Sequence, residues 1–313
     1  MNNRKLKIIL FFLTVLVLAL LIFSYSNYYS KRSKSNHSYN SLNDFGGIGM
    51  WTIIPQNFTQ EIYIGTNEKN PILPVAKLQN NSVLRWGIKR AKNNGLPSPD
   101  PGAAELISKY RGVYIGDTDS KKIYLTFDEG YENGYTPQIL DVLKNNNCKA
   151  IFFVTGPYLK QYPDLVMRMI EEGHYVGNHT IHHPSLPSLS DNQIEEELSG
   201  LERYFREKFN KNMIFMRPPR GEYNPRVLEI ADRLGYCTLF WSFAYDDWYK
   251  DKIRGAQYAH DIVMSNIHNG AVLLLHAVSK DNADALDSII KDAIAAGYEI
   301  GDPYELIPGE DDD

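Results

Sequence analysis

The sequence predicts an α/β fold whose parallel sheet closes into a barrel. From about Glu105 onward, short apolar runs of β type alternate with segments that have a helical pattern of apolar residues. Such alternation is typical of a parallel sheet, and six or more units of this size favour a closed barrel over an open sheet. With 313 residues, 43% of them hydrophobic, the chain can form one large domain or two smaller ones with a sizeable core.

The predicted elements follow one another in a regular order. The expected strands are Ile123–Phe127, Ala150–Thr155, Tyr175–Asn178, Met213–Met216, Cys237–Trp241 and Ala271–Leu275. The expected helices are Pro137–Asn146, Tyr158–Glu172, Asp191–Phe209, Pro225–Leu234, Tyr258–Ile267 and Ala283–Ala295. A further helix is predicted at Ser82–Lys92, because the Asn94-Gly95 pair and a proline two residues later form a typical helix stop.

The N-terminal third differs from the rest of the chain. Residues 1–30 contain basic residues followed by the apolar run Ile8–Phe23, which approaches the ~20 residues that span a bilayer. We prefer an uncleaved transmembrane anchor to a signal segment, since no small-residue cleavage site follows; cleavage would make the protein secreted. A leading helix of this kind places the long C-terminal part outside the cytoplasm. Residues 31–104 are expected to be a tether and a small N-terminal extension, and residues 105–308 the main domain.

Charge and cysteine content limit the possible partners. The formal net charge is -5 and no long basic stripe occurs, so we expect no nucleic-acid surface. Cys148 and Cys237 are 89 positions apart, so we expect buried free thiols rather than a disulfide.

Polar residues follow several predicted strands. Asp128 and Glu129 come directly after an apolar run and before Gly130, a pattern also found at solvated strand ends. The two carboxylates point to opposite faces if the strand continues, but a turn at Gly130 would bring both to one site. In a barrel, strand ends of this kind form the functional face.

Two imidazoles four residues apart, His179 and His183, would share one face of a helical turn, with His182 pointing elsewhere. With one carboxylate they would suit Zn, Fe, Co or Mn. Surface or capping histidines are the alternative.

Three further groups follow later strands. Arg217 and Arg220 flank two prolines that stiffen the backbone. Asp247 lies beyond the next strand. His276 ends a buried strand, where a neighbouring carboxylate would raise its pKa and let it act as an acid.

Together, these motifs resemble the polysaccharide deacetylase family, also called the NodB homology domain or carbohydrate esterase family 4. The family pattern is Thr-Phe-Asp-Asp-Gly, His-x-x-x-His, Arg-x-Pro, Asp-x-x-Asp-Trp and Leu-x-His. The matching residues, in order, are Thr126-Phe127-Asp128-Glu129-Gly130, His179 and His183, Arg217-Pro218-Pro219, Asp247-Trp248 and Leu274-Leu275-His276. The resemblance covers about Ile115 to Pro308 and implies a distorted (β/α)7-type barrel.

The resemblance also implies roles in the metal-assisted removal of an acetyl group from an N-acetylated sugar. Asp128 would be the base, Arg217 would orient it, and His276, tuned by Asp247, would protonate the leaving amine. The metal ligands would be His179, His183 and Glu129, holding one divalent ion, with zinc preferred over cobalt, manganese or iron. The Arg220 backbone N–H would donate to the oxyanion.

Three positions depart from the family pattern: Glu129 and Ala244 stand where aspartates are usual, and Arg220 where a tyrosine is common. With the sequences around them, they resemble the subgroup that deacetylates N-acetylmuramic acid in peptidoglycan, a step toward muramic δ-lactam in the spore cortex. We expect Arg220 to bind the lactyl carboxylate of muramic acid, or else to pair with Glu129. Tyr131 and Trp248 are expected to contact the substrate.

The expected function is therefore a peptidoglycan N-acetylmuramic acid deacetylase that acts on glycan strands outside the cytoplasm. One alternative is deacetylation of N-acetylglucosamine in peptidoglycan or in a surface polysaccharide. A second is a non-catalytic module that binds wall glycan, which the changes at Glu129 and Ala244 would allow.

Overall fold

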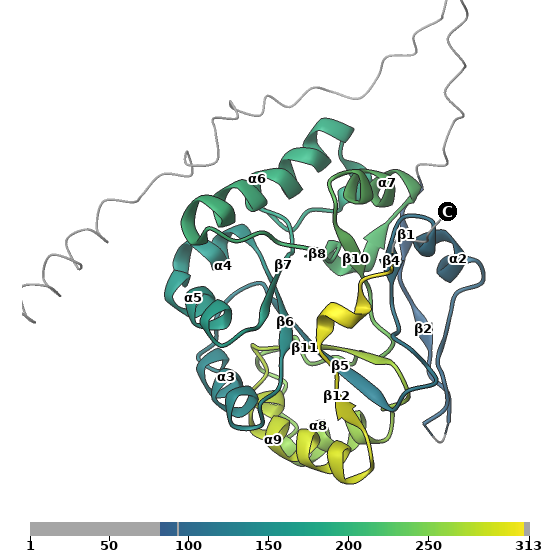
Figure 1. The fold of residues 1–313 in the computed structure, drawn as a ribbon, viewed down its shortest axis with the longest axis vertical. Helices are drawn as coiled ribbons and strands as arrows, with labels where there is room; N and C mark the ends of the chain where they lie inside the picture. The colour runs from purple at the N-terminus through teal and green to yellow at the C-terminus, as the bar shows by residue number, and fades with distance from the viewer. Residues whose placement is uncertain (1–81, 93, 310–313) are drawn as a thin grey trace, which may run out of the picture. The chain divides into compact units, whose positions relative to one another are not determined.

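Strand β5 (Lys122–Glu129) lies inside an eight-stranded parallel sheet, which the computed structural model shows for residues 82–92 and 94–309 (Figure 1). The strand order is β11 (Ala271–His276), β5, β6 (Ala150–Val154), β7 (Tyr175–Asn178), β8 (Phe215–Met216), β10 (Cys237–Leu239) and β4 (Gly112–Val113), with β12 (Glu299–Ile300) also pairing with β5. Every neighbouring pair is parallel. The predicted α/β parallel sheet is confirmed.

The sheet curves into a half-barrel whose two ends meet only at single points. Isolated bridges join Ile115 to Ala271 and Phe243 to Leu273, both on β11. The predicted barrel therefore has no continuous ladder of hydrogen bonds between β4 and β11. The carboxyl ends of the parallel strands still converge on one face, which places their side chains around a common site.

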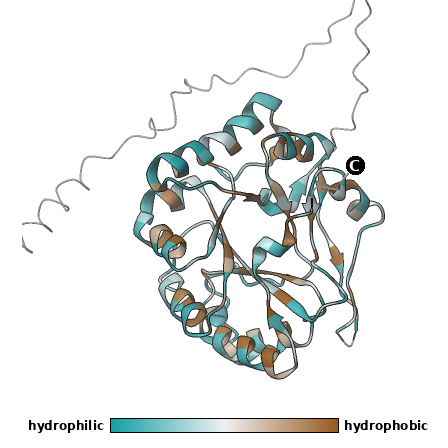
Figure 2. Cartoon of the chain, viewed as in Figure 1, coloured by the Kyte–Doolittle hydropathy of each residue, from teal (hydrophilic) through white to brown (hydrophobic). Residues whose placement is uncertain are grey.

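Helices surround the sheet and turn their apolar sides toward it (Figure 2). They are α3 (Thr136–Asn145), α4 (Gly156–Gln161), α5 (Pro163–Glu171), α6 (Asp191–Phe209), α7 (Pro225–Arg233), α8 (Ala256–Met264) and α9 (Lys280–Ala295), with short 3-10 turns at Leu186–Ser188, Pro219–Gly221 and Pro303–Leu306. The single helix predicted at Tyr158–Glu172 is two helices, because Pro163 starts a new one at its first position.

The helix predicted at Ser82–Lys92 is wrong. This segment forms β1 (Leu84–Arg85) and β2 (Ile88–Lys89), followed by β3 (Ser98–Pro99) and α2 (Ala103–Ser108). Strand β1 pairs antiparallel with β9 (Glu222–Tyr223). The apolar side chains at positions 84, 86 and 88 alternate with period two, which favours a strand. Burial of Trp86 and this long-range pairing override the local stop signal.

The interior of the half-barrel is a hydrophobic cluster. It contains Tyr124, Ile151, Phe153, Phe215, Cys237, Leu239, Val272 and Leu306. Both cysteines are buried and free, as predicted, and burial raises the pKa of the Cys148 thiol to about 11.

The predicted anchor at residues 1–30 and most of the predicted tether and extension lie outside the described residues. Within the described part of the chain, no helix combines the length and apolar character needed to cross a bilayer.

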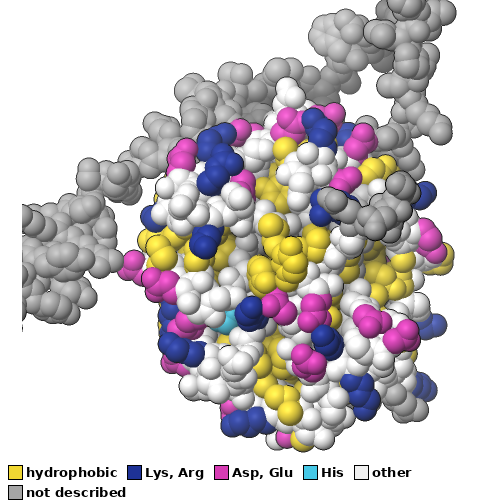
Figure 3. All heavy atoms as spheres, viewed as in Figure 1, with side chains coloured by type: hydrophobic (Ala, Val, Ile, Leu, Met, Phe, Trp, Pro, Cys, Tyr) yellow, Lys and Arg dark blue, Asp and Glu magenta, His cyan; other side chains and the backbone are white. Residues whose placement is uncertain are grey.

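On the face seen in Figure 3, Lys and Arg side chains are interspersed with Asp and Glu.

Candidate active site

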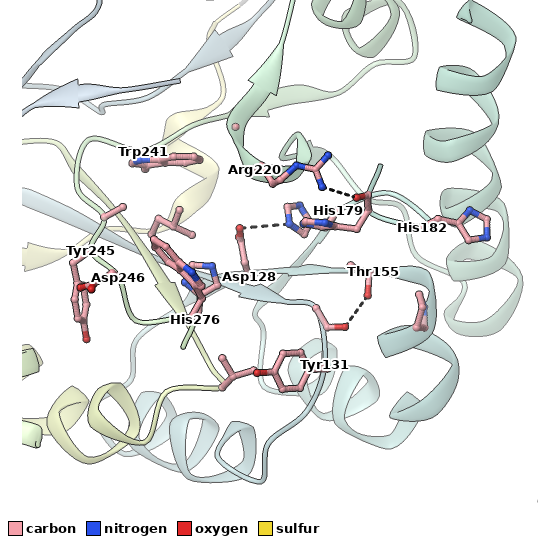
Figure 4. Close-up of a pocket in the computed structure, with 18 of the residues that line it drawn as sticks. Asp128, Tyr131, Thr155, His179, His182, Arg220, Trp241, Tyr245, Asp246 and His276 are labelled. Atoms are coloured by element: carbon pink, nitrogen blue, oxygen red, sulfur yellow. Dashed lines mark hydrogen bonds and ion pairs between the residues drawn. The ribbon is translucent and has the colours of Figure 1, made fainter. Parts of the chain in front are cut away.

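A pocket of about 890 Å³ opens at the carboxyl ends of the strands (Figure 4). It is lined by residues from β5, β11 and the loops after β7, β8 and β10. Of the predicted site residues, the lining includes Asp128, Tyr131, His179, His183, Arg220, Trp248 and His276. Residues separated by up to half of the chain thus meet at one cavity, because parallel strands end on the same side of a sheet.

Asp128 lies at the base of the pocket and is held by Arg217. Arg217 follows β8, is fully buried and donates from Nη1 to Asp128 Oδ1 at 2.7 Å. Its other nitrogens donate to Thr126 Oγ1 at 2.9 Å and to the carbonyl oxygens of Leu239 and Phe240 at 3.0 and 3.2 Å. Burial alone would raise the pKa of Asp128, but the guanidinium and the nearby imidazoles outweigh it and lower that pKa. Asp128 is therefore an oriented carboxylate.

His179 and His183 lie next to each other beside Asp128, with ring centroids 4.8 Å apart in an edge-to-face arrangement. They converge through a bent segment and not through the predicted helical turn, since Thr180 and His183 have φ values of 67° and 57°. His179 Nδ1 lies 2.8 Å from the Arg217 carbonyl oxygen, an acceptor only, so Nδ1 carries the proton and Nε2 keeps its lone pair. His179 Nε2 is 3.6 Å from Asp128 Oδ2.

His182 is oriented away from this pair, as predicted (Figure 4). Its Nδ1 lies 2.7 Å from Glu197 Oε1. Burial and the charge of His179 lower the pKa of His183 to about 4, and burial lowers that of His179 as well. Both inner imidazoles are therefore neutral near pH 7, the form that binds metals.

The prediction that Glu129 is a third ligand does not agree with the structure. Strand β5 continues through Glu129, so its side chain points to the face opposite Asp128. It is fully buried, accepts a hydrogen bond from Thr136 Oγ1 at 3.4 Å, and is not among the described residues that line the pocket. Burial, and then the charge of Glu132, raise its pKa well above the usual value. Its buried surroundings behind the site therefore favour the protonated form of Glu129.

This placement predicts that Glu129→Gln leaves metal binding unchanged, because glutamine copies the shape and neutrality of the protonated acid. The measurement is zinc affinity by titration calorimetry, with His183→Gln as the matched substitution inside the pocket. We expect Glu129→Gln to stay within about twofold of the unmutated protein and His183→Gln to lose about tenfold or more. Equal losses in the two variants would restore Glu129 as a ligand.

The residues present fit a divalent metal through the histidine pair. His179 Nε2 and the His183 ring offer two neutral imidazole donors, and the Asp128 carboxylate lies beside them. No third His, Cys, Asp or Glu completes a tight cluster in the part of the chain that the structure describes. Such a site would leave coordination positions for water and substrate, as catalytic metal sites do.

His276 lies across the pocket and is fixed by Asp247. Its Nδ1 and its backbone N–H are each 2.8 Å from an Asp247 carboxylate oxygen. Burial lowers the pKa of His276, but the Asp247 carboxylate outweighs burial and raises it. Asn282 holds Asp247 in turn, donating to its Oδ2 at 2.5 Å, while Tyr245 donates to the Asn282 side-chain oxygen. Asp247 thus favours the protonated form of His276 that an acid needs.

Arg220 lies on the rim of the pocket, beside His183. Its φ of 58° places it in the left-handed region, which is unusual for a residue with a side chain. Its Nη1 donates to the His183 carbonyl oxygen at 3.4 Å and its Nη2 to Glu222 Oε2 at 3.3 Å. The alternative pairing of Arg220 with Glu129 is therefore wrong, since Glu222 takes that place.

Aromatic side chains form the pocket walls. The predicted contacts Tyr131 and Trp248 are both 46% exposed and available to a ligand, and Trp241 and Tyr245 also line the cavity. Aromatic faces suit the apolar faces of sugar rings. Sequence reasoning gave no role to Trp241, Tyr245 or Asn282. Asn282 lies in the first turn of α9, where its backbone N–H donates to the side chain of the N-cap residue Ser279.

Comparisons with known proteins show which family the chain is similar to. Residues 115–239 match the polysaccharide deacetylase family. The chain is 45% identical over 219 residues to the peptidoglycan-N-acetylmuramic acid deacetylase PdaA of Bacillus subtilis, covering 70% of this chain and 83% of that protein. The structure of Bacillus subtilis PdaA, described as a family 4 carbohydrate esterase, has a TM-score of 0.70 at 44% identity and covers 72% of this chain and 97% of that one.

A relative named for another sugar is more distant. A peptidoglycan-N-acetylglucosamine deacetylase of Bacillus cereus is 34% identical over 194 residues, covering 60% of this chain and 89% of that protein. The family resemblance stated from the motifs is confirmed. The chain belongs to the polysaccharide deacetylase family, whose members are hydrolases that cleave the amide bond of N-acetyl groups.

Proposed function

We propose that this protein is a metal-dependent peptidoglycan deacetylase that removes the acetyl group of N-acetylmuramic acid. The observation that carries the proposal is the position of Arg220, which lines the pocket and is 48% exposed beside the histidine pair. Muramic acid differs from glucosamine by a lactyl carboxylate, and a guanidinium is a strong partner for a carboxylate. The relative PdaA, 45% identical, is named for this activity.

The residues of the pocket suit amide hydrolysis. Asp128, held as a carboxylate by Arg217, takes a proton from the attacking water, whose oxygen bonds to the carbonyl carbon. The Arg220 backbone N–H stabilises the negative oxygen, in the role that the family resemblance implies. His276, protonated beside Asp247, donates its proton to the nitrogen as the C–N bond breaks. The products are acetate and a free amine on the sugar.

His179 and His183 would hold the divalent ion, with zinc preferred over cobalt, manganese and iron. When bound, such an ion supplies Lewis acidity, which polarises the carbonyl and lowers the pKa of water.

We propose that residues 1–30 anchor the protein in a membrane, that residues 31–104 act as tether and extension, and that residues 105–308 form the catalytic domain outside the cytoplasm. In a spore-forming cell, the deacetylated muramic acid would lead to muramic δ-lactam in the spore cortex. The apolar run at Ile8–Phe23 supports the membrane anchor. The δ-lactam step depends on the muramic acid specificity proposed above.

Acetate release from two purified glycans tests the sugar assignment. One carries N-acetylmuramic acid and the other only N-acetylglucosamine, and each is assayed with and without a chelator. We expect release from the muramic glycan, lost with chelator and restored by zinc. Arg220→Ala should lower kcat/KM on the muramic glycan by about tenfold or more, the effect of one charge-assisted hydrogen bond, and change the other substrate much less.

Exposed Lys211 provides a control, since Lys211→Ala removes a positive charge from the loop after α6. Equal losses on both glycans in Arg220→Ala would contradict recognition of the carboxylate. Release only from the glucosamine polymer would support the alternative substrate, and no release with any metal would support a binding module.

A further inference from the structure

The segment Leu84–Trp86 of the N-terminal extension contacts the turn that carries Arg220. Strand β1 pairs Leu84 with Tyr223 and Arg85 with Glu222, and the Trp86 backbone N–H donates to the Gly221 carbonyl oxygen at 2.8 Å. This segment precedes the residues that match the family, 115–239. A part of the chain outside the residues that match the family model therefore packs against the turn that carries Arg220.

Trp86 fixes the backbone on two sides of the pocket. Its Nε1 donates to the Trp241 carbonyl oxygen at 2.9 Å, and its ring stacks on Phe240 with centroids 4.7 Å apart. A Cβ added to Gly221 would lie 2.7 Å from the Trp241 ring and 3.2 Å from Trp86 Cβ, so the turn is tightly enclosed. The left-handed backbone of Arg220 needs such surrounding contacts, because the conformation is unfavourable by itself.

Glu222 links the extension to the Arg220 side chain. Its side chain is only 8% exposed and is shared by two guanidinium groups, with Arg85 Nε 3.2 Å from Oε1 and Arg220 Nη2 3.3 Å from Oε2. A hydrogen bond from Ser185, and then those from Arg220 and Arg85, outweigh burial and lower the pKa of Glu222. Glu222 is therefore a carboxylate that two arginines neutralise.

We propose that Leu84–Trp86 is a positioning element for substrate recognition, in which Arg85 shares the charge of Glu222 so that Arg220 can engage the carboxylate of the substrate. The proposal rests on the proposed function, since it assumes a substrate with a carboxylate. Without Arg85, Arg220 would be the one guanidinium on Glu222, and Glu222 would compete with the substrate for it. The extension thus contributes to the choice of sugar.

The test is charge reversal at Arg85. This side chain is 77% exposed, so Arg85→Glu should fold normally while placing a second carboxylate beside Glu222. Lys89→Glu is the matched control, because it makes the same charge change at an exposed position of β2 in the same extension. We expect Arg85→Glu to raise KM for the muramic glycan about tenfold, the effect of one charge-assisted hydrogen bond.

The ratio of kcat/KM for muramic over glucosamine glycan should fall by a similar factor in Arg85→Glu, recover largely in Arg85→Lys, and stay constant in Lys89→Glu. A simple loss of fold would lower both activities and the thermal midpoint together. If Arg85→Glu matches Lys89→Glu while the unmutated protein deacetylates muramic acid, the positioning role is wrong. Failure of the proposed function would already be visible in the unmutated protein, as missing acetate from the muramic glycan.

Discussion

Replacing Asp128 by asparagine is expected to lower kcat by about 10²- to 10⁴-fold, the usual contribution of a positioned general base. Asparagine keeps the shape of the side chain and can still accept the hydrogen bond from Arg217 Nη1. It cannot take a proton from water, because its amide is not basic. The measurement is steady-state acetate release over a range of substrate concentrations, which separates kcat from KM.

The same substitution should also reduce stability, because it leaves the Arg217 cation buried without its counter-charge. Breaking a buried ion pair from one side typically costs about 3–5 kcal/mol, and the remaining acceptors of Arg217 place this variant at the lower end. The free energy of unfolding in urea measures the effect. The control is Asp141→Asn, because Asp141 also pairs with an arginine, Arg168, but is 66% exposed.

An exposed pair of that kind contributes about 0–1 kcal/mol, so the control should be nearly neutral in stability and activity. Activity of Asp128→Asn within tenfold of the unmutated protein would rule out Asp128 as the base.

Replacing Asp247 by asparagine is expected to move the basic limb of the kcat profile to lower pH. His276 acts as an imidazolium, so activity is present below its pKa and is lost as the pH rises through it. The Asp247 carboxylate raises that pKa against the effect of burial. Without this negative charge the pKa of His276 falls. When the pH is above the new pKa, each tenfold increase in the acidity of His276 lowers its imidazolium fraction about tenfold. The value of kcat at pH 8 should fall by the same factor.

The loss should be smaller at pH 6, which distinguishes a change in protonation from general damage to the site. Asp246→Asn is a suitable comparison, since the neighbouring Asp246 pairs with Arg254 at 2.7 Å and does not hold His276. A basic limb that stays in place in Asp247→Asn would show that another group supplies the proton.

The sequence predicted the regular elements well where burial or local capping determined them. Helix α6 occupies Asp191–Phe209 as predicted, because Ser190 and Gln193 form a capping box at its start and Asn210 ends it in the left-handed conformation. Strands β5, β6, β7 and β11 lie where continuous apolar runs required buried strands. The extension was mispredicted because β1 depends on pairing with β9, where Arg85 and Glu222 are 137 positions apart, and β2 on pairing with β3.

The site was predictable to the extent that strand ends determine it. Asp128 and His276 lie at the carboxyl ends of β5 and β11, and His179 and Arg217 directly follow β7 and β8. A parallel sheet therefore brings Asp128, His179 and His276 to one cavity, with Arg217 behind Asp128. The metal-ligand role predicted for Glu129 does not agree with the structure, because the direction of its side chain depends on whether β5 ends one residue earlier. The adjacent glycine is compatible with either end of the strand. Asn282 and Trp86 were missed because their partners, Asp247 and Gly221, are distant in sequence and no local pattern connects them.

Neighbouring residues at the end of β5 are under different constraints, because their side chains lie on opposite faces of the strand. Asp128 faces the pocket, while Phe127 and Glu129 are fully buried on the opposite face of the strand. A single-residue deletion within β5 would exchange these sides, since strand faces alternate with period two. It would carry the longer Glu129 side chain into the cavity and bury the aspartate on the face that the helices cover. Sequence variation within β5 should therefore proceed by substitution and not by changes in length.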